Sequence, residues 1–98
     1  MRPALPTLIE NHRAELLARG QRHGVAHLRL FGSMARGDAT ADSDVDLLVD
    51  PLPGTSALDL GALLMDVQDL LRRRVDIVTT RSLSPLIRQQ VLDEARPL

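Results

Sequence analysis

Hydrophobic positions recur along this chain with two periods, which predict helices and strands in alternation. Spacings of three and four residues indicate amphipathic helices, and short apolar runs or strict alternation indicate strands. The predicted elements, in chain order, are a helix over 7–23, a strand over 26–31, a short helix over 34–36, a strand over 44–50, a helix over 56–73, a strand over 75–79 and a final helix from Ser84. The order α-β-α(short)-β-α-β-α predicts an α/β fold with a small mixed β-sheet flanked by helices.

Residues at the predicted helix ends support this assignment. Thr7 followed by Glu10 has the pattern of a capping box, and Ser84-Pro85 places a capping hydroxyl before a residue suited to the first helical position. Ser33 is expected to be the N-cap of the short helix, and Gly37 is expected to end it.

Two aspartates alternate on the second predicted strand. Asp44 and Asp46 are two residues apart, so their side chains should leave the same face, with Cα atoms about 6.6 Å apart. Carboxylates this close can converge on two Mg²⁺ ions of the kind used in phosphoryl chemistry, and the ions would offset their mutual repulsion. The alternative is an exposed strand face on which alternating acids are ordinary.

A turn between the first strand and the short helix carries the matching signals for phosphate. Gly32 allows a close approach to the main chain, and the N–H groups of a helix start attract anions. Ser33 and Arg36 can add contacts to a triphosphate. Arg36 could instead only complement the helix dipole, and Ser43, a further candidate for nucleotide binding, could instead only hold its loop.

Asp76 lies in the third predicted strand between apolar neighbours. Its side chain should leave the opposite face from Val75 and Ile77, and a lone carboxylate there is costly to bury without a partner. If this strand pairs beside Asp44 and Asp46, Asp76 can bind metal or take the proton of an attacking hydroxyl. The alternative is an acid at a strand edge that pairs with an arginine.

Composition narrows the possible partners. The 98 residues predict one domain over 1–98, with acceptor recognition supplied by another chain. A formal net charge of −1, one Phe and no Tyr or Trp argue against direct nucleic-acid binding. The absence of cysteine excludes disulfides, and no apolar run is long enough for a membrane span or resembles a signal peptide. A cytoplasmic location is expected.

Leu30-Phe31-Gly32-Ser33-Met34-Ala35-Arg36-Gly37, the spacing from Gly32-Ser33 to Asp44 and Asp46, and the later run around Asp76 resemble the minimal nucleotidyltransferase family of the DNA polymerase β-like superfamily. The chain end from Leu83 is similar to the small members encoded beside a HEPN-domain ribonuclease. The resemblance implies the minimal nucleotidyltransferase fold and a protein adenylyltransferase that acts as an antitoxin. Such an enzyme transfers AMP from ATP to a tyrosine of the HEPN toxin, in a hetero-oligomeric complex, and thereby neutralises it.

Under this hypothesis, three aspartates are both catalytic and metal-binding: Asp44, Asp46 and Asp76. Four residues bind nucleotide: Gly32, Ser33, Arg36 and Ser43. Two alternatives stay open. The chain could neutralise its partner by binding alone, without catalysis. It could also transfer a nucleotide to a small molecule or an RNA end, with a separate subunit that binds the acceptor.

Overall fold

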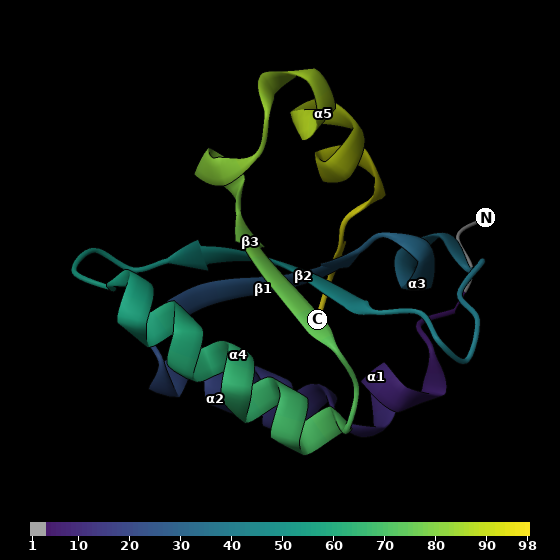
Figure 1. The fold of residues 1–98 in the computed structure, drawn as a ribbon, viewed down its shortest axis with the longest axis horizontal. Coiled ribbons are helices and arrows are strands. Elements are labelled where there is room, and N and C mark those ends of the chain that lie inside the picture. Colours follow the sequence, from purple (N-terminus) through teal and green to yellow (C-terminus); the bar gives the residue numbers. More distant parts are fainter. Residues whose placement is uncertain (1–3) are drawn as a thin grey trace.

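A four-stranded mixed sheet forms the centre of the computed structural model, which describes residues 4–98 (Figure 1). Its strands, in the spatial order β3-β2-β1-β4, are β1 (Val25–Phe31), β2 (Val45–Pro51), β3 (Val75–Thr79) and β4 (Arg96–Pro97). β1 runs antiparallel to both β2 and β4, whereas β2 and β3 are parallel. β2 and β3 can run parallel because the connection between them contains a helix, which carries the chain back to the end of the sheet at which β2 begins.

Helices cover both faces of this sheet. They are α1 (Thr7–Asn11), α2 (Arg13–Arg22), α3 (Ser33–Arg36), α4 (Ala57–Leu71) and α5 (Pro85–Glu94), with a 3-10 turn, η1 (Thr80–Ser82), after β3. Figure 1 shows α2 and α4 on one face and α5 on the other. The larger core lies under α2 and α4, whereas Leu48 of β2 packs with Val91 of α5 in a smaller cluster. The predicted α/β class and mixed sheet are therefore confirmed.

The first predicted helix is broken in two at His12. The chain leaves helical geometry there (φ −116°, ψ 11°), and the His12 imidazole lies 2.8 Å from the Leu8 carbonyl oxygen. The imidazole thus takes the acceptor that the His12 backbone N–H would use in a continuous helix, and that N–H donates to the Ile9 carbonyl instead. The predicted capping box was also wrong, because Pro6 is the N-cap, without a side-chain bond, and Thr7 lies inside the helix.

The later helices follow the sequence signals closely. Ser56 caps α4 in a capping box with Asp59, and Arg72 ends it in the left-handed conformation (φ 56°). Ser84 caps α5 by accepting from the Leu86 N–H, with Pro85 at the start of the helix as predicted. The short β4 was not predicted, since two residues give no periodicity. Among residues 4–98, no helix is both long and apolar enough to cross a membrane.

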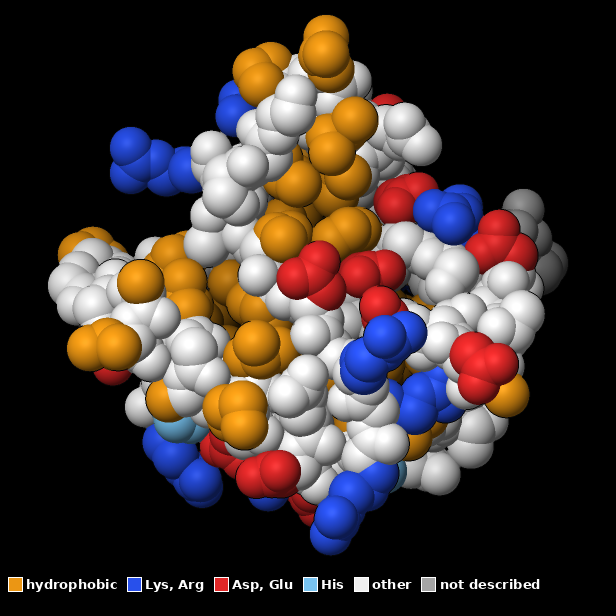
Figure 2. Space-filling model, in the orientation of Figure 1, with side chains coloured by type: hydrophobic (Ala, Val, Ile, Leu, Met, Phe, Trp, Pro, Cys, Tyr) orange, Lys and Arg blue, Asp and Glu red, His pale blue; other side chains and the backbone are white. Residues whose placement is uncertain are grey.

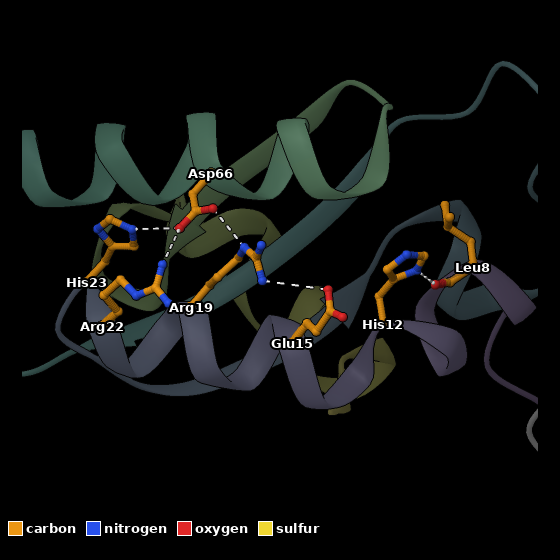
Figure 3. A network of polar contacts seen from close by, with 7 residues as sticks. All are labelled: Leu8, His12, Glu15, Arg19, Arg22, His23 and Asp66. Atoms are coloured by element: carbon orange, nitrogen blue, oxygen red, sulfur yellow. Dashed lines mark hydrogen bonds and ion pairs between the residues drawn. The ribbon is translucent and has the colours of Figure 1, made fainter.

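A polar network fastens α2 to α4 (Figure 3). Asp66 of α4 accepts from Arg19 Nε at 2.7 Å and lies 3.0 Å from Nε2 of His23, and both partners come from the end of α2. The His23 and Arg19 contacts hold the pKa of Asp66 below its ordinary value. These contacts join the two helices under β1 and β2, so they support the core rather than the candidate chemistry.

Candidate active site

Asp46 and Asp76 stand side by side on neighbouring strands. They are register partners in the parallel pair of β2 and β3. Val45, Leu47 and Val49 belong to the core on the opposite face, so the alternation predicted for β2 is confirmed. The fold thus brings together two carboxylates from positions thirty residues apart (76 − 46).

The electrostatic environment of Asp46 is strongly acidic. Partial burial raises its pKa above the ordinary value, and the neighbouring charges of Asp76 and Asp44 raise it further, while Arg36 opposes them. Within residues 4–98, neither Asp46 nor Asp76 makes a hydrogen bond or an ion pair with a side chain or loop group. These carboxylates therefore repel each other without a counter-charge in contact.

Gly32 forms the turn beside Asp46. Its backbone has φ 75° and ψ −157°, a conformation that only glycine adopts readily, and a Cβ atom there would lie 2.2 Å from Asp46 Oδ2. Gly32 is also the N-cap of α3, so Ser33 is the first helical residue and the prediction for Ser33 as N-cap was wrong by one position. Gly37 ends α3 in the left-handed conformation (φ 84°), as predicted.

Asp44 lies just before β2 and has a cationic partner. Its Oδ1 accepts from Arg74 Nε at 3.0 Å, and the Arg74 side chain is 82% exposed. Among residues 4–98, no three acidic or histidine side chains come together as a preformed metal-binding group. Asp44 is near enough to raise the pKa of Asp46, and unlike Asp46 and Asp76 it has an arginine in contact.

Ser43 and Arg36, the two other candidates, have protein partners. The Ser43 hydroxyl accepts from the Thr40 N–H at 2.8 Å, and its carbonyl accepts from Arg73 at 2.7 Å, so it holds the loop before β2. Arg36 donates to Asp38 at 3.3 Å, and this hydrogen bond is the chief reason that its pKa is raised. The nucleotide-binding roles of both residues stay predictions.

Glu94, at the end of α5, is a site residue that the sequence did not indicate. Its Oε1 accepts from the Gly32 N–H at 2.9 Å, and its Oε2 lies 3.3 Å from Arg36 Nη1. The two segments are 62 residues apart in the chain, and no spacing rule joins them. Figure 2 shows acidic side chains gathered near the middle of this face, with basic side chains beside them.

The donor set suits a hard divalent cation. Carboxylate oxygens are the ligands that Mg²⁺ prefers, and Asp46 and Asp76 present them from adjacent strands without a bound cationic side chain. Asp44 could join them once it leaves Arg74, and exposed ion pairs of this kind are worth only about 0–1 kcal/mol. The residues present therefore fit such an ion.

An open hollow of about 340 Å³ lies at the other end of the first two strands, where β1 begins and β2 ends. Its lining includes Gly24, Leu52 and Thr55. It contains none of the candidate site residues, so it is separate from the carboxylates described above.

Comparison with known proteins agrees with this geometry. Residues 9–98 match the family described as the nucleotidyltransferase domain. The protein adenylyltransferase MntA of Thermococcus cleftensis is 39% identical over 90 residues, which are 92% of this chain and 88% of that protein.

Two solved structures show the same fold. A structure assigned as a minimal nucleotidyltransferase superposes with a TM-score of 0.85 and 44% identity, over 98% of this chain and 100% of the other. A toxin–antitoxin structure with AMP-PNP gives a TM-score of 0.71 and 27% identity, over 90% of this chain and 70% of the other. The strands that carry Asp46 and Asp76 and the Gly32 turn thus lie within a shared framework, and the chain belongs to the nucleotidyltransferase domain family, with the minimal nucleotidyltransferase fold.

Proposed function

We propose that this protein transfers AMP from ATP to a tyrosine of a partner HEPN ribonuclease toxin and thereby neutralises it. The observation that carries the proposal is the pairing of Asp46 with Asp76 beside the Gly32 turn. A relative 39% identical is named a protein adenylyltransferase, and a structural neighbour is a toxin–antitoxin structure with AMP-PNP. Both names support protein modification over transfer to a small molecule.

The donor half of the reaction is assigned to the turn and α3. Gly32 lets the chain turn closely against Asp46 because it lacks a side chain, and Ser33 and Arg36 follow it on α3. Arg36 is about half exposed, so its guanidinium is accessible to an arriving triphosphate. In this assignment the three residues hold the phosphates, and Ser43 shapes the loop that carries Asp44.

The acceptor half of the reaction, in which the toxin tyrosine attacks ATP, takes place at the carboxylates of Asp46 and Asp76. The tyrosine oxygen attacks the α-phosphorus of ATP, a new P–O bond forms, and the bond from the α-phosphorus to the bridging oxygen breaks to release pyrophosphate. Asp76 is exposed and adjacent to Asp46, so it is placed to take the tyrosine proton. Positioning and charge stabilisation supply most of the rate.

Mg²⁺, as two ions, is the cofactor that Asp44, Asp46 and Asp76 would hold. When bound, it neutralises phosphate charge and lowers the energy of the transition state. Its binding would also offset the repulsion that raises the pKa of Asp46.

The test is incubation of the protein with labelled ATP, Mg²⁺ and a purified HEPN toxin. Label on a toxin tyrosine, lost in the double variant Asp44→Ala/Asp46→Ala, supports the proposal. If neither protein labels the toxin, yet both suppress its ribonuclease activity, neutralisation occurs by binding alone. Label on a small molecule or an RNA end instead would assign a different acceptor.

A further inference from the structure

We propose that Glu94 is a positioning residue of the nucleotide site, whose carboxylate holds the Gly32 turn and the Arg36 guanidinium in the arrangement that receives the triphosphate. The inference rests on the proposed function, because it adds a supporting residue to the same site. It assigns a role in nucleotide binding to the end of α5.

The contacts come from one partly buried carboxylate. The Glu94 side chain is 17% exposed. Its Oε1 accepts from the Gly32 N–H at 2.9 Å, and its two oxygens lie 3.5 and 3.3 Å from Arg36 Nη1. Hydrogen bonds to an ionised acceptor are about twice as strong as neutral ones, so the carboxylate is a firm support for the turn.

The sheet explains why a side chain is needed at this point. β4 pairs with β1 at Leu30 with Arg96 and at Arg29 with Pro97, and the Leu98 N–H donates to the Leu28 carbonyl. The pairing therefore runs away from Gly32 and does not reach it. Gly32 is buried, and a buried N–H requires an acceptor. Glu94, two residues before Arg96, supplies a side-chain oxygen where the backbone of β4 no longer can.

The position of Gly32 affects the rest of the site. Its Cα lies against the Asp46 carboxylate so closely that a Cβ would clash, and α3 with Arg36 starts directly after it. A shift of the turn therefore moves the main chain beside Asp46 and the helix that carries Arg36. Glu94 acts on the nucleotide through these groups and does not touch it.

The opposite role for Glu94 is competition, in which its carboxylate occupies Arg36 until phosphate displaces it. The geometry favours positioning. The shortest contact is with the buried main chain of Gly32, whereas Arg36 is 47% exposed, is contacted at longer distance and is shared with Asp38. The two roles predict opposite changes in the KM for ATP.

The experiment compares Glu94→Ala and Glu94→Gln with wild type. It measures kcat and KM for ATP in transfer to the HEPN toxin, and the Kd for AMP-PNP with Mg²⁺. Glu94→Ala should raise both KM and Kd about tenfold, since a charge-assisted hydrogen bond is lost. Glu94→Gln keeps an oxygen for the Gly32 N–H and should stay within about threefold of wild type. Asp93→Asn, the same charge change on an exposed neighbour that contacts Gln89, is the matched control.

A lower KM in either Glu94 variant would assign the competing role and overturn the proposal, as would a Glu94→Ala protein that behaves like Asp93→Asn. A structural role alone would lower Tm without a change in KM or Kd, which also counts against positioning.

Hydrogen exchange of the Gly32 amide gives a readout independent of nucleotide. If wild type neither transfers AMP nor binds AMP-PNP, the proposed function fails. The nucleotide role of Glu94 then fails with it, and faster Gly32 exchange in Glu94→Ala than in Asp93→Asn supports only the hold of Glu94 on the turn.

Discussion

Asp46 and Asp76 are register partners on the parallel strands β2 and β3, and within residues 4–98 no side chain forms an ion pair with either of them. Two adjacent carboxylates without a counter-charge are unfavourable in a site built for stability alone. The cost is explained if the pair awaits a cation. The predictions below follow from this relationship and from the contacts around it.

Asp46→Asn should abolish AMP transfer and stabilise the protein measured without metal. Burial and the charges of Asp76 and Asp44 raise the pKa of Asp46 in the folded state. Such a group favours the folded state below its unfolded pKa, and this contribution is lost as pH rises through the folded pKa. Wild type should therefore lose stability relative to Asp46→Asn as pH rises from the acidic range towards neutrality. Urea unfolding at several pH values with EDTA checks this, and parallel curves would contradict it.

Mg²⁺ with AMP-PNP should raise the Tm of wild type and leave that of Asp46→Asn unchanged. A ligand that binds only the folded state stabilises it by about 2.7 kcal/mol at one hundred times its Kd. Thermal unfolding with and without the ligand pair measures the shift. Ca²⁺, a larger ion with looser geometry, serves as the comparison metal. Equal Tm shifts in wild type and Asp46→Asn would show that Asp46 is not part of the binding site.

Gly32→Ala should destabilise the protein and eliminate transfer. The φ of 75° and the 2.2 Å approach of the new Cβ to Asp46 Oδ2 both oppose the substitution. Backbone strain of this kind alone costs about 1–3 kcal/mol. Gly61→Ala is the matched control, because Gly61 is an exposed residue of α4 with nothing within 4 Å of its added Cβ. That change should stabilise the protein by about 0.5–1 kcal/mol. Chemical denaturation and activity of both variants test the contrast.

Arg74→Ala should lower the Mg²⁺ concentration required for half-maximal activity. Arg74 Nε lies 3.0 Å from Asp44 Oδ1, so Arg74 competes with a metal ion for that oxygen. Exposed pairs are worth roughly 0.2–1 kcal/mol, so the expected change is about 1.4- to 5-fold. Arg81→Ala, the same charge change on an exposed residue of η1, is the control. A higher Mg²⁺ requirement in Arg74→Ala would show that Arg74 supports the site.

Asp66→Asn should destabilise the protein by about 1.5–3 kcal/mol, as expected for lost hydrogen bonds to charged groups, without an effect on the KM for ATP. Hydrogen bonds from His23 and Arg19 lower the pKa of Asp66, so its contribution is present above the unfolded pKa and is lost as pH falls through the folded pKa. The stability difference between variant and wild type should therefore shrink in acid. A changed KM would instead connect this network to the site.

The site was predictable where it depended on local chemistry. Alternation alone placed Asp46 on the face opposite Val45 and Leu47, and glycine chemistry alone marked the turn at Gly32. Ser33 was misplaced by one position because the N-cap requires a backbone conformation, and only the structure shows that Gly32 adopts it. The break at His12 was missed because the helical periodicity of the apolar residues continues across it.

The sequence by itself determined the order of the longer elements, the nature of the donors and their spacing along each strand, because side-chain period and turn chemistry act within a few residues. Only the tertiary structure decided which groups meet. Strand register placed Asp76 beside Asp46, Arg74 came into contact with Asp44, and the end of α5 brought Glu94 to the Gly32 N–H. Contacts across thirty or more residues depend on how the helices pack on the sheet, and no local pattern encodes them.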